Sequence, residues 1–354
     1  MSVLKKVLLL MLIVVLALPL VGCSPQPTAA PVEEVAPVVE EEEAAPAEVT
    51  EEPATEEPAP EAKTYETVVV GFAQIGAESE WRTAETQSIK EEAENLGVEL
   101  RFSDAQQKQE NQIKAIRSFI AQQVDVIGVA PVVESGWETV FQEAKDAGIP
   151  IVLVDRRADV PDDLFATFIG SDFVLEGQNA CKEMAALLGD TGKIVELQGT
   201  VGAGPAIDRK AGFEECLAGF PNMEMIASQS GDFTRAKGKE VMEAFLKTYG
   251  AEINGVYAHN DDMAIGAIQA IEEYGLKPGE DIKIVSVDGV RGAFEAMAEG
   301  KLNVTVECNP LLGPQFYEVA LKLANGETVE PWVKSNEGIY RQDTAAQDLP
   351  NRKY

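Results

Sequence analysis

Charged and aromatic side chains recur in this sequence just after short apolar runs, where a strand would give way to a helix. They are Glu78, Ser79, Glu80, Trp81, Arg82, Asp155, Arg156, Arg209, Phe233, Asn260 and Asp288. Carboxylates and guanidinium groups can bridge the neighbouring hydroxyls of a sugar, and aromatic rings can stack on its C–H faces. Each polar residue alone could be a helix cap or a solvated ion pair. Their recurrence favours a binding site for a polar, ring-shaped ligand.

The sequence lacks most of the residues that catalytic, metal-binding or dinucleotide-binding sites require. The only histidine is His259, so neither a Ser-His-Asp triad nor a histidine-rich metal site is expected. The glycines of "GTVGAG" follow the order GxxGxG and not the GxGxxG of a dinucleotide site. We therefore expect a binding protein rather than an enzyme, with no cofactor and no bound metal.

The elements that must position these residues alternate along the chain. Apolar, β-rich runs cover residues 67–72, 98–103, 124–131, 149–155, 193–198, 223–228, 254–258 and 281–287. Helical patterns cover residues 80–96, 109–122, 136–147, 174–188, 208–217, 234–247 and 261–274. This alternation predicts parallel sheets with helices on both faces, and its restart after residues 166–172 predicts two doubly wound α/β units in tandem. Ligands of such sheets bind at the carboxyl ends of the strands.

The first 64 residues read as an export signal and a tether. Lys5 and Lys6 precede an apolar run over 7–20 that is too short to cross a membrane, and "LVGC" ending at Cys23 resembles the lipobox of bacterial lipoproteins. That resemblance predicts a signal peptide over 1–23 and lipidation of Cys23; an ordinary signal peptide is the alternative. Residues 24–64 hold twelve glutamates, eight prolines and one lysine, which predicts a disordered acidic tether.

Charge, length and cysteine content narrow the class of protein further. The net charge of -31 argues against nucleic acid as a partner. The residues beyond 64 are too many for one hydrophobic core, which favours two domains. Cys181 and Cys216 either form a disulfide across neighbouring helices or remain free thiols, and the spacing does not decide between these alternatives.

Several long motifs resemble one known family. Among them are "DAQQKQENQIKAIRSF", "VELQGTVGA", "AIDRKAGF", "SQSGDFTR" and "YAHNDDMAIGAIQAI". From about residue 67 to the C-terminus the chain resembles the type I periplasmic binding proteins of sugar transport systems, and within them the branch that binds galactofuranose. The resemblance implies two Rossmann-like lobes joined by a three-strand hinge. It places crossovers near residues 170–172, 308–310 and 332–336, with one lobe formed by 65–171 plus 309–334 and the other by 172–308 plus 335–354.

The resemblance also implies partners and a role. The chain would be an exported, lipid-anchored monomer that binds a monosaccharide, galactofuranose or a related sugar, and delivers it to an ABC permease. Two departures stand near the expected ligand: Glu80, and the segment Glu307 to Pro310. The alternatives are a sugar sensor that acts on a chemoreceptor or kinase, and a secreted sugar-active hydrolase using Glu78 and Glu80. The effector domain of a sugar-responsive transcription regulator shares the fold, but it would need a DNA-binding helix-turn-helix before the first strand, where the signal and the tether stand.

Overall fold

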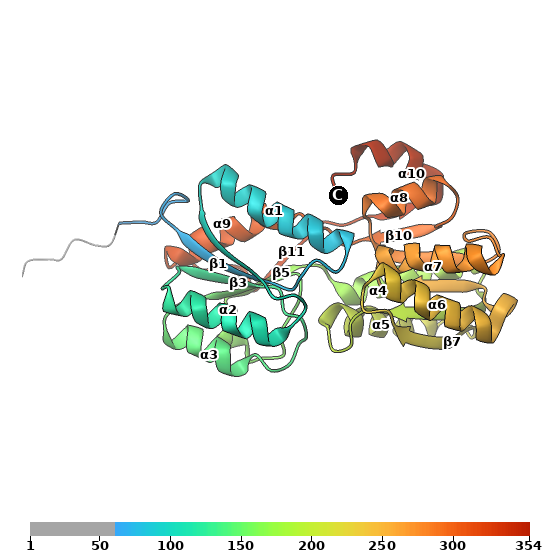
Figure 1. The fold of residues 1–354 in the computed structure, drawn as a ribbon, viewed down its shortest axis with the longest axis horizontal. Helices are drawn as coiled ribbons and strands as arrows, with labels where there is room; N and C mark the ends of the chain where they lie inside the picture. The colour runs from blue at the N-terminus through green and yellow to red at the C-terminus, as the bar shows by residue number, and fades with distance from the viewer. Residues whose placement is uncertain (1–60) are drawn as a thin grey trace, which may run out of the picture. The chain divides into compact units, whose positions relative to one another are not determined.

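The computed structural model describes residues 61–354, and Figure 1 shows their fold. The predicted signal peptide, the lipidation at Cys23 and the predicted tether up to residue 60 lie outside the described residues. Within the described part, no helix combines the length and the apolar character needed to cross a membrane.

The first lobe is built around a parallel sheet of six strands in the order β11-β5-β4-β3-β1-β2. Its strands are β1 (Val69–Gln74), β2 (Glu99–Asp104), β3 (Val126–Val129), β4 (Ile151–Val154), β5 (Thr167–Gly170) and β11 (Trp332–Lys334). Its helices are α1 (Glu80–Leu96), α2 (Gln109–Ala121), α3 (Glu138–Asp146) and α9 (Gly313–Ala324), with a short 3-10 helix at Asp162–Leu164. Helices α1 and α9 cover one face of the sheet, and α2 and α3 cover the other (Figure 1).

Alternating strand residues supply both cores of this lobe. Val70 and Phe72 of β1 pack with Ile89 of α1 and Phe316 of α9. The intervening Gly71 faces α2 so closely that a Cβ there would lie 2.6 Å from the ring of Phe119. A strand buried on both faces therefore reads as one continuous apolar run in the sequence, as observed.

The second lobe is built around a six-stranded sheet in the order β12-β10-β9-β8-β6-β7. Its strands are β6 (Thr191–Gln198), β7 (Asn222–Ser230), β8 (Gly255–Ala258), β9 (Lys283–Asp288), β10 (Val304–Glu307) and β12 (Ile339–Arg341), and β12 pairs antiparallel with β10. Its helices are α4 (Phe173–Leu188), α5 (Gly204–Leu217), α6 (Arg235–Tyr249), α7 (Asp261–Tyr274), α8 (Arg291–Ala298) and α10 (Gln342–Asp348), with 3-10 helices at Gly250–Glu252 and Leu349–Asn351.

The chain passes from one sheet to the other three times, after β5, after β10 and after β11. The predicted fold class of two doubly wound lobes is therefore confirmed. The antiparallel β12 is the one departure from the predicted parallel sheets, and it arises because the chain enters the second sheet from β11 with no crossover helix between the two strands.

Helices α4 and α5 are held together both covalently and by close packing. Cys181 of α4 forms a disulfide with Cys216 of α5, with 6.1 Å between their Cα atoms. A Cβ at Gly177 would lie 2.1 Å from the carbonyl oxygen of Arg209, so only glycine permits this approach of the two helix backbones. The contact brings the N-terminal half of α4 against the middle of α5.

Loss of this disulfide is expected to lower the stability of the second lobe. The bridge closes a loop of 35 residues, so the double substitution Cys181→Ala, Cys216→Ala should lower the free energy of unfolding by about 2 to 4 kcal/mol. Urea denaturation of the oxidised protein, the reduced protein and the variant measures this. The reduced protein should match the variant, and an unchanged free energy in both would contradict the prediction.

Candidate ligand-binding site

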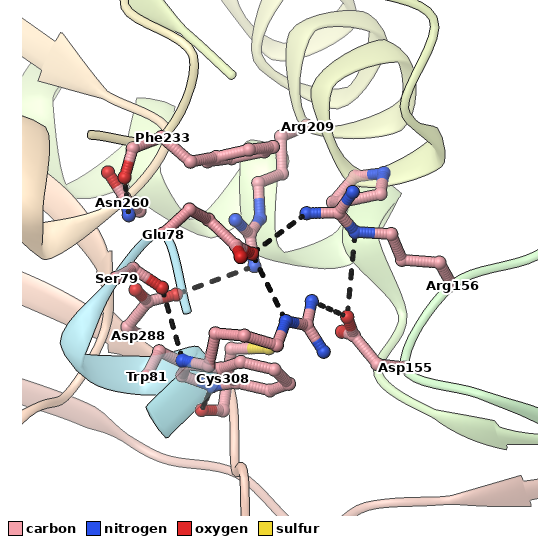
Figure 2. A pocket seen from close by; sticks show the side chains of 12 residues that line it. Glu78, Ser79, Trp81, Asp155, Arg156, Arg209, Phe233, Asn260, Asp288 and Cys308 are labelled. Carbon is pink, nitrogen blue, oxygen red and sulfur yellow. Dashed lines mark hydrogen bonds and ion pairs between the residues drawn. The ribbon is translucent and has the colours of Figure 1, made fainter. Parts of the chain in front are cut away.

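A pocket lies where the carboxyl ends of the two sheets face each other, and Figure 2 shows the side chains that line it. They are Glu78, Ser79, Trp81, Arg82, Asp155, Arg156, Pro205, Arg209, Phe233, Asn260, Asp288 and Cys308. Every residue that the sequence predicted for the site is among them except Glu80. Pro205 and Cys308 are additional.

The start of α1 positions the residues of the first lobe. Ser79 is the N-cap, and its hydroxyl accepts a hydrogen bond from the backbone N–H of Arg82 at 3.1 Å. This cap ends the loop after β1 and sets Glu78, Trp81 and Arg82 around the first turn of the helix. The indole N–H of Trp81 donates to the carbonyl oxygen of Cys308 at 2.6 Å, so the ring is fixed against the segment that follows β10.

Arg82 donates hydrogen bonds to three carboxylates of its own lobe. Its guanidinium donates to Glu78 at 3.1 Å, to Glu85 at 2.8 Å and to Asp155. Burial alone would lower the pKa of Arg82, but attraction by Asp155, Glu85 and Glu78 outweighs burial and holds that pKa well above its usual range. Arg82 is therefore a permanently charged group that organises this wall of the pocket.

Arg156 is buried with far fewer partners. Its Nη1 donates to the carbonyl oxygen of Val132 at 3.1 Å, while its nearest carboxylate oxygens, on Asp155 and Glu78, lie 3.6 and 3.7 Å away. Burial, together with repulsion by Arg82, lowers the pKa of Arg156 to about 10. Its guanidinium carbon lies 5.2 Å from the ring centroid of Phe233 across the pocket.

Arg209 of α5 plays the corresponding part in the second lobe. Its Nε donates to Glu176 of α4 at 2.7 Å, its Nη1 donates to the carbonyl oxygen of His259 at 2.6 Å, and its Nη2 lies 3.8 Å from Asp288. Burial raises the pKa of Glu176 to about 8 despite the attraction of Arg209. Burial also raises the pKa of Asp288 well above its usual range, again against the pull of Arg209.

Phe233 and Asn260 complete the wall of the second lobe. Phe233 has a φ of 60°, a conformation that non-glycine residues rarely adopt, and its carbonyl oxygen accepts a hydrogen bond from Asn260 Nδ2 at 3.1 Å. The side-chain oxygen of Asn260 caps α7 by accepting from Met263 N–H. A Cβ at Gly199 would lie 1.9 Å from the Phe233 ring, so the ring rests directly on the glycine backbone.

Acidic and basic side chains line the pocket in equal number, and two of its buried polar atoms lack partners. The pocket has three carboxyl groups (Glu78, Asp155 and Asp288) and three guanidinium groups (Arg82, Arg156 and Arg209). Among the described residues, neither Glu78 Oε2 nor Arg156 Nε has a hydrogen-bond partner. Since unpaired buried polar atoms are costly, they mark where a ligand would bond. The site fits a neutral ligand that carries both donors and acceptors.

Glu176, Cys308 and Glu337 form a group near the pocket whose ligand atoms lie within 4.8 Å of one another, as a metal site requires. However, Glu176 is already bonded to Arg209, and Ser171 donates a hydrogen bond to Glu337. Burial raises the pKa of the Cys308 thiol well above its usual range, and a protonated thiol is a poor metal ligand. The group instead packs the segments where the chain crosses between the lobes.

Glu80 does not line the pocket. It is the first residue of α1, and its carboxylate lies beside Arg235 at the edge of the second lobe, with 37 % of its side chain exposed.

Cys308 and Pro205 were not predicted as lining residues, although the sequence held an indication of each. Cys308 falls in the predicted second crossover, and Pro205 follows the glycine-rich "GTVGAG" loop.

Comparisons with known proteins agree with this architecture. Residues 70–328 match the periplasmic binding protein domain family, and the chain belongs to this family. It is 51 % identical to the galactofuranose-binding protein YtfQ of Escherichia coli, over 81 % of this chain and 92 % of that protein.

Two solved structures are also similar. The binding protein of the arabinose ABC transporter of Shewanella sp. ANA-3, bound to α- and β-L-arabinofuranose, is 50 % identical with a TM-score of 0.79, over 81 % of this chain and 96 % of that chain. A Mycobacterium smegmatis protein in complex with β-D-fucofuranose is 52 % identical with a TM-score of 0.79, over 81 % of this chain and 95 % of that chain. The chain is thus an exported solute-binding protein and not an enzyme.

Arg82 and Arg156 should differ sharply in their contribution to stability. Arg82→Met leaves Glu78, Glu85 and Asp155 without their shared cation and should lower the free energy of unfolding by about 3 to 5 kcal/mol. Arg156→Met is the matched control. This variant removes a cation whose pKa is lowered by folding. We expect its free energy of unfolding to stay within about 1 kcal/mol of the wild-type value. Chemical denaturation without ligand measures both, and equal losses would refute this account of the charges.

Proposed function

We propose that this protein captures a furanose sugar between its lobes and delivers it to an ABC permease. The observation that carries the proposal is a pocket lined by equal numbers of carboxyl and guanidinium groups, in which two buried atoms, Glu78 Oε2 and Arg156 Nε, are unpaired. A hydroxyl group can donate to the carboxylate and accept from the guanidinium, so neighbouring ring hydroxyls would satisfy both atoms. Trp81 and Phe233 supply flat apolar surface for the C–H faces of the ring.

The sugars named for the relatives support a particular ring configuration. Those proteins bind galactofuranose, L-arabinofuranose and D-fucofuranose. D-Fucose is galactose without its terminal hydroxyl, and L-arabinose lacks that carbon, so all three furanoses share the arrangement of their ring hydroxyls. We infer that the pocket of this protein recognises the same ring, with galactofuranose as the first candidate.

Capture would involve closure of the two lobes on the ligand. Glu78, Ser79, Trp81, Arg82, Asp155 and Arg156 would bind one side of the sugar, and Arg209, Phe233, Asn260 and Asp288 the other. A ligand that contacts both lobes favours the closed arrangement over an open one, and the permease would recognise the closed form. No covalent or acid–base step is needed.

The N-terminal segment supports a lipid anchor as part of this function. Cys23 ends a lipobox-like sequence, and the acidic segment after it would hold a monomeric binding domain near the membrane that carries the permease.

Selectivity for the furanose ring can be tested with galactose and a locked derivative. Free galactose contains a minor furanose fraction, whereas methyl galactopyranoside cannot open. We expect thermal stabilisation and calorimetric binding with galactose and L-arabinose but not with the methyl pyranoside; a ligand at 100 times its Kd stabilises the native state by about 2.7 kcal/mol. Equal binding of the locked pyranoside would overturn the furanose assignment. Binding of ribose or xylose alone would overturn the ring configuration and leave the class of protein intact.

The anchor can be tested separately. Cys23→Ala should release the full-length protein from membranes into the soluble fraction, while the sugar affinity of the purified protein stays unchanged because Cys23 is far from the pocket in sequence. Fractionation followed by calorimetry measures both. A variant that still sediments with membranes would show that lipidation at Cys23 is the wrong explanation.

A further inference from the structure

The N-terminus of α1 in the first lobe is capped by a carboxylate of the second lobe. The backbone N–H of Glu80, the first residue of α1, donates to Asp262 Oδ2 at 2.7 Å. Asp262 lies in the first turn of α7 and is buried. The free N–H groups at a helix N-terminus and the helix dipole both favour a negative charge at this place.

The side chain of Glu80 makes the reciprocal contact with α8. This helix begins at Arg291 after Val290, which offers no side-chain cap. Glu80 Oε2 lies so near Gly292, the second residue of α8, that a Cβ there would be 3.0 Å from it. Burial and the neighbouring Asp262 raise the pKa of Glu80, while Arg235 and the backbone N–H of Gly292 favour its charged form. Each lobe therefore places one carboxylate at a helix N-terminus of the other.

Arg235 joins the two carboxylates, which would otherwise repel each other. It donates to Asp262 through Nε at 3.1 Å and through Nη2 at 2.9 Å, and Nη2 also lies 3.6 Å from Glu80 Oε2. Arg235 and Glu80 are 44 % and 37 % exposed, so the group lies at the rim and is accessible to salt. None of the three residues lines the pocket.

The contacts of Glu80 with Asp262, Gly292 and Arg235 join atoms of different lobes, whereas the Arg235–Asp262 pair lies within the second lobe. None of these residues lines the pocket. Separation of the lobes would break the Glu80–Asp262, Glu80–Gly292 and Glu80–Arg235 contacts together. Interactions present only in the closed form raise its population, and the observed Kd equals the intrinsic Kd divided by the fraction of protein that is competent to bind. We propose that Glu80, with Asp262 and Arg235, forms a latch between the lobes that sets sugar affinity without touching the sugar.

This inference rests on the proposed sugar-binding function and predicts a particular pattern of affinities. Glu80→Ala should weaken binding about tenfold, which corresponds to about 1.4 kcal/mol. The loss should be moderate because alanine removes only the side-chain contacts with Arg235 and Gly292 and keeps the backbone N–H that bonds Asp262. The lobes also keep other contacts, such as the bond from Glu134 N–H to the Gly202 carbonyl oxygen at 2.9 Å. The factor should be the same for galactose, L-arabinose and D-fucose, because the latch does not contact the ligand.

The experiment compares wild type, Glu80→Ala and the control Glu94→Ala, which removes an exposed carboxylate from the same helix. Calorimetry with the three sugars gives the affinities at low and high salt. Small-angle X-ray scattering gives the mean separation of the lobes with and without sugar. We expect Glu80→Ala alone to lose affinity uniformly, to lose most of its salt dependence and to be more open without sugar, while the sugar-saturated forms scatter alike.

The outcomes separate the latch from the proposed function. Wild-type affinity in Glu80→Ala would overturn the latch, and a loss confined to one sugar would instead make Glu80 a ligand contact. Failure of the wild type to bind any of the sugars would refute the proposed ligand. In that case the scattering of the ligand-free proteins decides, and identical curves for wild type and Glu80→Ala would overturn the latch as well.

Discussion

The burial of three guanidinium groups in one small pocket is the constraint on which the rest of the site depends, because a charge in a protein interior is tolerated only beside groups that neutralise it. Arg82 is satisfied by Glu78, Glu85 and Asp155, all within the first lobe. Arg209 is satisfied by Glu176 and the His259 carbonyl, all within the second. Each lobe can therefore fold with its principal guanidinium group already hydrogen-bonded. The polar groups left over, on Glu78 and Arg156, face the space between the lobes, where a ligand can satisfy them.

This division explains why each lobe holds its own half of the site in place while the two lobes can move relative to each other. Arg82 lies in the first turn of α1 and Arg209 in the second turn of α5. The disulfide and the glycine contact between α4 and α5 fix Glu176 beside Arg209. Hydrogen-bond donors held in this way need no rearrangement when a hydroxyl approaches, so little of the binding free energy is lost in ordering them. The remaining motion is the approach of one lobe to the other, and it is governed by the three crossings and by contacts at the rim.

Most of the site was predictable from the sequence because parallel sheets gather the residues after their strands at one edge, whatever the loop details. The start of α1 was also predictable, since Ser79 is a strong N-cap. The start of α5 was placed four residues late, because Gly204 and Pro205 read as a loop although proline is well suited to the first turn of a helix. The pairing of Cys181 with Cys216 and the orientation of Glu80 depend on how helices dock, and local sequence does not encode that distance or direction.

Affinity and selectivity have different structural origins in such a molecule. Contacts with the sugar contribute a free energy that changes with every hydroxyl that is inverted or removed, since a site built from hydrogen bonds leaves its own groups unpaired when the ligand lacks the matching hydroxyl. Contacts between the lobes contribute the same free energy for every ligand that permits closure. Substitutions at the rim, of which Glu80 is an instance, can therefore tune how tightly all sugars are held, whereas only the residues that line the pocket can change which sugar is preferred. Stronger contacts between the lobes would raise the affinity for poorly fitting sugars by the same factor as for well-fitting ones. Selectivity among sugars must therefore come from the arginines and carboxyl groups of the pocket.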